Sequence, residues 1–386
     1  MDGAPFNVYM LTNPPSTGNA VVALRVSSTG AVAPIAGSPF LTGGTGMAVV
    51  PGGDYSHRIA VSAATARLFA ANELEGSIAV LNINRQTGAL TPAPGSPFVV
   101  SGWAGFAGMS LTVSGDGQFL YGSSVTVASF KVASNGALTE VGARWAFSSR
   151  TNGSVVSEAN DYLYLAMSDR VTALKVGPSG LTGFPPTTLS LGTTPTDVVL
   201  NHAGNTLYVG TRGGIQAFYT SGGVFTPVPG TPFFPTSQNL SGLSIDTYDR
   251  LLIGYGQTGP QLSASLLVNG GALQPGPASP FPPTLAPTGA ALSPDGRRLF
   301  LSNDASQLDA WNVDEAGGLS HVPGYPSTLG VSSGFSKLVT FPSSEGAQAP
   351  ALPWGVGVLL AVSLMFSAVA NRKRWRTSPC SQSSDS

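Results

Sequence analysis

Short stretches of alternating hydrophobic and polar residues fill most of this chain, and turn residues separate them. The clearest example begins with "TGAALSPDG" (288–296), which predicts a strand that ends in an Asp-Gly turn. "RRLFLSND" (297–304) predicts a second strand, with Leu299 and Leu301 on one face and Phe300 on the other. "QLDAWNVD" (307–314) and "LSHVPGYPS" (319–327) predict a third and a fourth strand. A period of two broken by Gly, Asp and Asn is typical of antiparallel hairpins, so we expect a four-stranded sheet.

The last strand of this unit recurs along the chain. "GAVAPIAGSPF" (30–40) returns as "GALTPAPGSPF" (88–98), "GVFTPVPGTPF" (223–233) and "GALQPGPASPF" (271–281), and weaker copies begin at Gly136, Gly180 and Gly318. The leading glycines are 58, 48, 44, 43, 48 and 47 residues apart. A repeat of this length with four strands predicts the blades of a propeller. We expect each leading glycine to adopt a positive φ, and each Ser-Pro-Phe to cross between blades with its aromatic ring packed there.

The two ends of the repeat region predict how the ring closes. "NVYMLTN" (7–13) resembles a second strand with no first strand before it, and "GFSKLVTF" (334–341) resembles a first strand with no second strand after it. The other second strands begin near Arg67, Gln118, Asp161, Asn205, Arg250 and Arg297. The strands therefore make complete blades only if the two ends share one. We predict an all-β, seven-bladed propeller over residues 5–342.

Second strands such as "LYVGT" (207–211) and "LFLSN" (299–303), the latter after "SPDG", resemble the YVTN-type repeats of lactonase-like propellers. The "GALTPxPGSPF" endings are similar to the same family. The resemblance spans nearly the whole ring and implies its fold. Such propellers include 6-phosphogluconolactonase-like and muconate-cycloisomerase-like enzymes as well as many exported proteins, and a fold does not by itself identify a function.

Composition removes several classes of function. Gly and Pro make up 80 of 386 residues, about a fifth of the chain against roughly 12 % on average, which fits a turn-rich protein. The net charge of −1 argues against nucleic acid as a partner, because phosphate binding needs clustered Lys and Arg. Cys380 is the only cysteine, so we expect no disulfide framework. The sequence has no spacing typical of a metal site and no phosphate-binding loop, so we predict neither a metal nor a cofactor.

Candidate site residues are few. His57 lies in a polar linker, His202 in a turn between first and second strands, and His321 on an outer strand. Because these positions are not equivalent in the repeat, we expect surface or turn histidines that do not converge. The candidate binding residues lie where second strands end, at one mouth of the ring: Glu73, Arg212, Asn303 and Asp304, with Glu75, Asp169 and Arg170 nearby. The alternative for these residues is turn stabilisation by their own side chains.

After a linker at 343–351, "LPWGVGVLLAVSLMFSAVA" runs for 19 residues from Leu352 to Ala370 without a charge. At about 1.5 Å per residue this stretch would span about 28 Å, close to the roughly 30 Å of a bilayer core, so we predict a transmembrane helix. Trp354 and Trp375 are suited to the membrane interfaces. The tail at 371–386 is basic, with Arg372, Lys373, Arg374 and Arg376, which predicts a cytoplasmic tail and an external propeller.

The order of proline motif ("APALPWG"), hydrophobic helix and basic end resembles bacterial exosortase-type sorting tails. That resemblance implies a sorting protease as a partner beside the membrane, whereas without it the helix is a permanent anchor. The start "MDGAPFN" has neither the basic nor the apolar region of an export signal. We therefore expect the true start to lie upstream. The alternative is a cytosolic propeller, which would require the four tail cations to cross the membrane.

These patterns lead us to expect an exported propeller, membrane-anchored or sorted to the surface, that acts as a binding or cell-envelope module for an extracellular ligand or partner. The first alternative is a lactonase-type, 6-phosphogluconolactonase-like hydrolase that uses the mouth of the channel, and the second is a purely architectural repeat protein. One structural feature separates the first two. A hydrolase needs His or Arg beside a carboxylate of shifted pKa in the channel, whereas a binding module presents a broad, polar, weakly charged face.

Overall fold

The computed structural model describes residues 4–14, 18–47, 57–105, 108–234, 240–256, 261–330 and 335–343. They lie in a compact unit that spans Met1–Gly346. The predicted transmembrane helix at 352–370, the basic tail, the sorting motif and nearly all of the linker lie outside the described residues. Within the described ranges, no helix is long and apolar enough to cross a membrane. The helical element in these ranges is the short 3-10 turn η1 (Asn269–Gly271).

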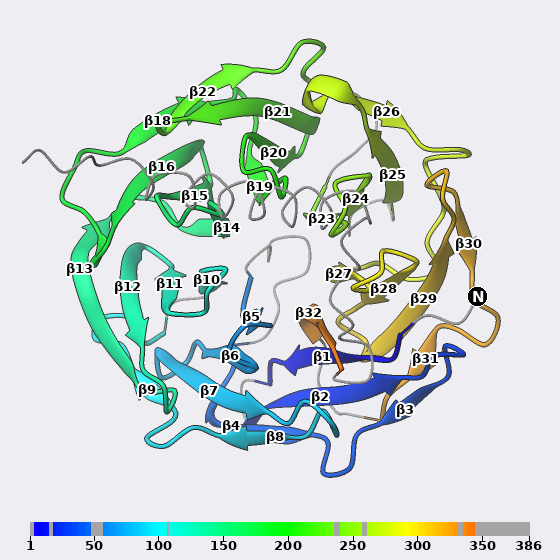
Figure 1. Ribbon diagram of the computed structural model, residues 1–386, viewed down its shortest axis with the longest axis horizontal. Coiled ribbons are helices and arrows are strands. Elements are labelled where there is room, and N and C mark those ends of the chain that lie inside the picture. The colour runs from blue at the N-terminus through cyan, green and yellow to red at the C-terminus, as the bar shows by residue number, and fades with distance from the viewer. Residues whose placement is uncertain are drawn as a thin grey trace, which may run out of the picture. The chain divides into compact units, whose positions relative to one another are not determined.

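Seven antiparallel sheets surround a common centre, as predicted (Figure 1). We number these blades from the one that contains the N-terminal strands. Blade 1 consists of β32 (Phe335–Pro342), β1 (Phe6–Thr12), β2 (Gly18–Val26), β3 (Val32–Pro34) and β4 (Phe40–Thr45). Blade 2 consists of β5 (Ile59–Ser62), β6 (Arg67–Asn72), β7 (Ser77–Ile83), β8 (Leu90–Pro92) and β9 (Phe98–Val99). Blade 3 consists of β10 (Ser110–Val113), β11 (Phe119–Ser123), β12 (Thr126–Val132) and β13 (Leu138–Ala146).

The other four blades repeat this order from the centre outward. Blade 4 consists of β14 (Thr151–Val156), β15 (Tyr162–Met167), β16 (Arg170–Gly177), β17 (Gly180–Leu181) and β18 (Thr187–Ser190). Blade 5 consists of β19 (Pro195–Leu200), β20 (Thr206–Thr211), β21 (Gly214–Ser221) and β22 (Val224–Pro227). Blade 6 consists of β23 (Gly242–Ile245), β24 (Leu251–Gly256), β25 (Gln261–Leu267) and β26 (Leu273–Pro275). Blade 7 consists of β27 (Gly289–Leu292), β28 (Arg298–Ser302), β29 (Gln307–Val313), β30 (Leu319–His321) and β31 (Ser327–Thr328).

The ring closes through a shared blade. Strand β1 pairs with β2 on one side and with β32 on the other, so the inner strand of blade 1 comes from the far end of the repeat region. The antiparallel register between β1 and β32 runs from Phe6 opposite Pro342 to Met10 opposite Leu338, with an irregularity after Met10. This pairing confirms the predicted closure and removes the open edge that an incomplete blade would leave.

Hydrophobic side chains form one cluster at each of the seven junctions between blades. At the junction of blades 1 and 2, for example, Tyr9 and Val21 pack with Ile59 and Leu68, and Phe40 of a Ser-Pro-Phe segment packs against them. The aromatic rings of these segments therefore pack between blades, as expected. The leading glycines adopt positive φ at Gly30, Gly88, Gly136, Gly180, Gly223 and Gly271, but in the seventh copy the positive φ falls on Gly317 rather than on Gly318.

The innermost strands, β5, β10, β14, β19, β23, β27 and β32, line the centre of the ring (Figure 1). Each begins its blade's meander, so all of them run in the same direction along the central channel. Residues at their starts therefore lie at one opening, which we call the start-side opening. The turns that follow these strands lie at the other, the turn-side opening.

Candidate functional site

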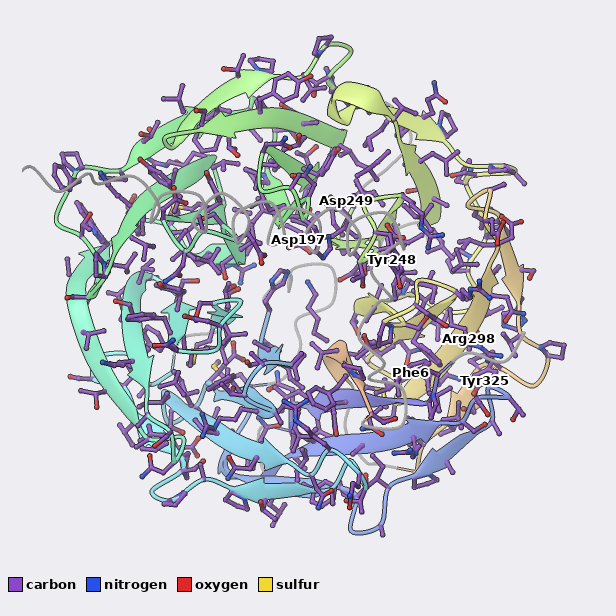
Figure 2. All side chains as sticks on the ribbon, viewed as in Figure 1. Phe6, Asp197, Tyr248, Asp249, Arg298 and Tyr325 are labelled. Carbon is purple, nitrogen blue, oxygen red and sulfur yellow. The ribbon has the colours of Figure 1, made fainter. Side chains whose placement is uncertain are left out.

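A cluster of charged side chains lies in the channel near the start-side opening. Its centre is Asp197, the third residue of β19, which points toward the middle of the ring (Figure 2). The carboxylate is completely buried. Its Oδ1 lies 2.5 Å from Nε2 of His57, which precedes β5. Its Oδ2 accepts a hydrogen bond of 3.1 Å from Nζ of Lys337, the third residue of β32.

The backbone completes the environment of Asp197. The N–H of Leu243 in β23 donates to Oδ2 at 2.9 Å, and the N–H of Val198 donates to Oδ1 at 2.8 Å. The cluster therefore draws on the inner strands of blades 1, 5 and 6 and on His57, two residues before the inner strand of blade 2. A buried carboxylate is costly unless it is paired and hydrogen-bonded, and Asp197 meets both conditions.

Both charges of the central pair are firmly held. Burial tends to raise the pKa of Asp197, but the charges of His57 and Lys337 and the hydrogen bonds from His57 and the Leu243 N–H outweigh it and lower that pKa to about 2. Burial tends to lower the pKa of Lys337, but the neighbouring Asp197 and Tyr255 outweigh it and raise that pKa above its ordinary value. At neutral pH the channel therefore holds a carboxylate and an ammonium.

The structure corrects our expectation that His57 is a surface histidine. Its Nε2 is buried against Asp197, while 17 % of the side chain remains exposed. Nε2 is the ring nitrogen that faces the carboxylate, so a proton on Nε2 is favoured, and in the neutral ring with that proton Nδ1 carries the free lone pair. A histidine oriented by a carboxylate in this way is the usual arrangement of a general base.

A cavity of about 330 Å³ adjoins the cluster. His57 and Lys337 line one end, and residues of β5, β19, β23, β27 and β32 form its walls. It extends along the channel to Thr247 and Ser293, which follow their inner strands on the turn side. The volume falls within the range of small-molecule sites, at its lower end.

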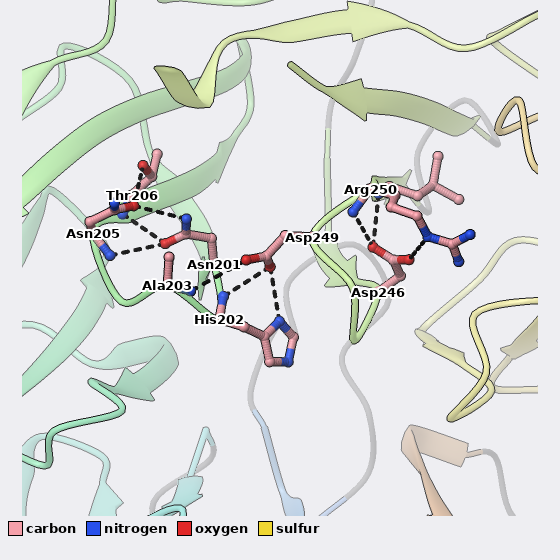
Figure 3. A network of polar contacts seen from close by, with 9 residues as sticks. Asn201, His202, Ala203, Asn205, Thr206, Asp246, Asp249 and Arg250 are labelled. Carbon is pink, nitrogen blue, oxygen red and sulfur yellow. Dashed lines mark hydrogen bonds and ion pairs between the residues drawn. The ribbon is translucent and has the colours of Figure 1, made fainter. Parts of the chain in front are cut away.

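The other two histidines lie elsewhere, so the three do not converge, as expected. His202 is in the turn after β19, where its Nδ1 lies 2.9 Å from Oδ1 of Asp249 and its N–H donates to the same oxygen (Figure 3). Asn201 and Asp246 close their own turns in the same view (Figure 3). Nε2 of His321, on the outer strand β30, lies 2.8 Å from the buried Asp309, which also accepts a hydrogen bond from Trp311.

The candidate binding residues at the ends of second strands are mostly engaged in local structure. Glu73 is buried, pairs with Arg58 at 2.8 Å and accepts hydrogen bonds from the N–H groups of Gly108 and Met109. Asn303 accepts from the N–H groups two and four residues later, as a turn residue does.

The remaining candidates are at the surface. Glu75 accepts a hydrogen bond from the Thr45 N–H, Asp169 pairs with Arg170, and Arg212 and Asp304 are exposed. None of the candidates is among the residues that line the cavity or contact Asp197 in the described part of the chain. Their binding of a ligand stays a prediction.

Comparison with known proteins agrees with this architecture. The model of the family described as "Lactonase, 7-bladed beta-propeller" matches residues 47–183, about a third of the chain, which contain blades 2 and 3 and strands β14 to β17 of blade 4. No curated protein matches the chain in sequence.

Solved structures match over most of the ring. A putative 6-phosphogluconolactonase from Bacteroides fragilis NCTC 9343 has a TM-score of 0.70 at 14 % identity, over 87 % of this chain and 98 % of its own. The periplasmic gluconolactonase of Pseudomonas aeruginosa has a TM-score of 0.69 at 16 % identity, over 87 % and 99 %. A putative 6-phosphogluconolactonase from Bacteroides uniformis ATCC 8492 has a TM-score of 0.67 at 13 % identity, over 87 % and 99 %. At these identities the likeness shows the fold alone. The chain therefore has the fold of a seven-bladed β-propeller, and the sequence pattern of the lactonase family matches part of it, residues 47–183.

Proposed function

We propose that this propeller is a hydrolase that opens lactones, which are cyclic esters, in its central channel. The observation that carries the proposal is the imidazole of His57 beside the ionised Asp197 and the ammonium of Lys337 at one end of a cavity. This arrangement has the feature that separates a hydrolase from a binding module, namely a histidine beside a carboxylate of shifted pKa in the channel. The similarity to proteins named as gluconolactonases also supports the hydrolase over the binding module that we first expected.

The reaction assigns one role to each side chain. Nδ1 of His57 removes a proton from a water molecule, whose oxygen then forms a bond to the lactone carbonyl carbon. The ammonium of Lys337 stabilises the negative oxygen of the tetrahedral intermediate. The ring carbon–oxygen bond then breaks, and the protonated His57 returns its proton to the leaving oxygen, which yields one hydroxy acid from one lactone and one water. Asp197 is a positioning residue, since it orients His57 and holds Lys337 without meeting the substrate.

General acid–base catalysis by one positioned side chain is typically worth about 10²- to 10⁴-fold, and an oxyanion partner about 10²- to 10³-fold. We therefore expect His57→Gln to lower kcat at least about 100-fold, because glutamine keeps a polar side chain but accepts no proton at neutral pH. The assay is hydrolysis of glucono-δ-lactone and of simple alkyl lactones by the full-length protein in mild detergent, followed by acid release at constant pH.

His202→Gln is the matched control. His202 also pairs with an aspartate, but it lies in a turn at the opposite opening and does not line the cavity. Its substitution should leave the rate within about twofold. If no lactone is hydrolysed above the rate in buffer, or if both variants lose activity equally, the proposal is wrong.

We also propose, from the sequence alone, that residues 352–370 hold the propeller at a membrane. The length of the uncharged stretch and the basic residues after it support this anchor. An anchored enzyme would act on lactones close to the membrane, so the anchor and the hydrolase activity are compatible.

A further inference from the structure

We infer that the channel favours an uncharged lactone that carries an aliphatic substituent over a phosphorylated or polyhydroxylated one. This inference rests on the proposed function and concerns the substrate class of the same site. It derives from the contrast along the cavity, which is charged at His57 and Lys337, mainly aliphatic along the inner strands beyond them, and lined by hydroxyl groups such as those of Thr247 and Ser293 at the turn-side opening.

The apolar part consists of side chains from the inner strands. Val61, Val199, Ile245, Ala291 and Val339 line the cavity and are only half-buried. They come from blades 2, 5, 6, 7 and 1, so the wall surrounds much of the channel. Aliphatic groups that remain exposed inside a closed ring gain by burial against an apolar ligand. A substituent that leaves the reacting carbonyl toward the turn-side opening would meet this wall.

The charges of the site also favour an uncharged substrate. Among the residues that line the cavity in the described part of the chain, Lys337 is the one Lys or Arg. Its charge is already balanced by Asp197 at 3.1 Å, so this ammonium–carboxylate pair has no net charge. A phosphate ester carries up to two negative charges, and sites that bind it use uncompensated Arg or Lys or several N–H donors. A neutral ester needs only the single ammonium at its carbonyl oxygen.

The size of the cavity limits the substituent. One liquid water occupies about 30 Å³, so a cavity of about 330 Å³ has room for on the order of ten non-hydrogen atoms. A six-membered lactone with a three-carbon side chain has this size. Burial of one methylene is worth about a fourfold gain in affinity. We expect kcat/KM to rise on the order of 50-fold from δ-valerolactone to δ-octalactone and to level off by δ-dodecalactone.

The test compares these alkyl lactones with glucono-δ-lactone and 6-phosphogluconolactone as substrates of the full-length protein. Val199→Thr replaces a methyl group of the wall with a hydroxyl at nearly the same volume, and it should lower kcat/KM several-fold more for δ-octalactone than for δ-valerolactone. Val224→Thr is the control, since Val224 lies on the outer strand β22 and is 57 % exposed.

A rise with chain length that Val199→Thr reduces would support the inference. Faster hydrolysis of either sugar lactone than of δ-octalactone, or a rate independent of chain length, would overturn the substrate class and leave the proposed function standing. Hydrolysis of no lactone at all would overturn both.

Discussion

Replacement of Asp197 by Asn tests whether one buried carboxylate holds the channel cluster together. Asn has almost the same shape, but it leaves the ammonium of Lys337 buried without a counter-charge. At the 3.1 Å between Nζ and Oδ2, and with an effective dielectric constant of about 20, the attraction is about 5 kcal/mol. The cost of removing the two charges from water cancels part of this attraction. The fall in the pKa of Asp197 from 3.8 to about 2 corresponds to a net gain of about 2 kcal/mol. The ammonium of Lys337, buried without a partner, adds a further penalty, so we expect the free energy of unfolding of the variant to fall by about 3–5 kcal/mol.

The pH dependence provides a second readout of the same substitution. Because folding lowers the pKa of Asp197, its contribution to stability is complete above pH 4 and disappears as the pH falls from about 4 to about 2. The wild-type protein should lose this increment in acid, and Asp197→Asn should not. In the variant, Lys337 has lost the partner that raised its pKa, so the stability of the variant should increase toward alkaline pH as the ammonium loses its proton.

Urea unfolding of the full-length protein in mild detergent, followed by tryptophan fluorescence between pH 2.5 and pH 10, measures both effects. The double variant Asp197→Asn, Lys337→Met removes both charges and should recover most of the lost stability, because no unpaired charge remains buried. The reasoning is refuted if Asp197→Asn unfolds at the wild-type urea concentration, or if the double variant is less stable than Asp197→Asn.

Two further predictions concern the core and the tail. A Cβ at Gly122 would overlap the buried ring of Trp103, so overpacking in Gly122→Ala should lower the free energy of unfolding by about 1–3 kcal/mol in the same urea titration. Gly183→Ala is the control, because the space around its Cβ is open, and its free energy of unfolding should stay within about 0.5 kcal/mol of wild type. From the sequence of 352–370, we predict that the full-length protein floats with lipid vesicles in a density gradient and that truncation after Ser344 abolishes this flotation. Flotation of the truncated protein would contradict the proposed anchor.

The ring could be predicted from the sequence because a propeller repeats the same local pattern in every blade. The alternation of strands, the glycine turns and the Ser-Pro-Phe crossovers are local signals, and the unmatched strands at 7–13 and 334–341 indicated the shared blade. The cluster in the channel depends on positions that no local pattern relates. Asp197 and Lys337 are 140 residues apart, and only the closed ring brings them together.

Two signals could nevertheless have pointed to the site. Asp197 in "PTDVVL" and Lys337 in "FSKLVT" each place a charge inside an otherwise uncharged inner strand, where a charge needs a partner. His57 gave no such signal, because the pattern did not predict which way a residue in a linker points. The candidates at the ends of second strands were attractive because they are polar and near a mouth, yet the Asn303 side chain is occupied by the turn itself.

The strand that closes the ring also carries the ammonium of the site. During synthesis, His57 and Asp197 emerge long before β32, and Asp197 lacks its ammonium partner until β32 pairs with β1. A chain that stops short of this strand, or whose first blade has opened, would lack a complete charge cluster as well as a closed ring. The charge cluster is therefore complete only when the last strand is in place. A partly folded chain would have a channel open to solutes but no complete catalytic cluster in it.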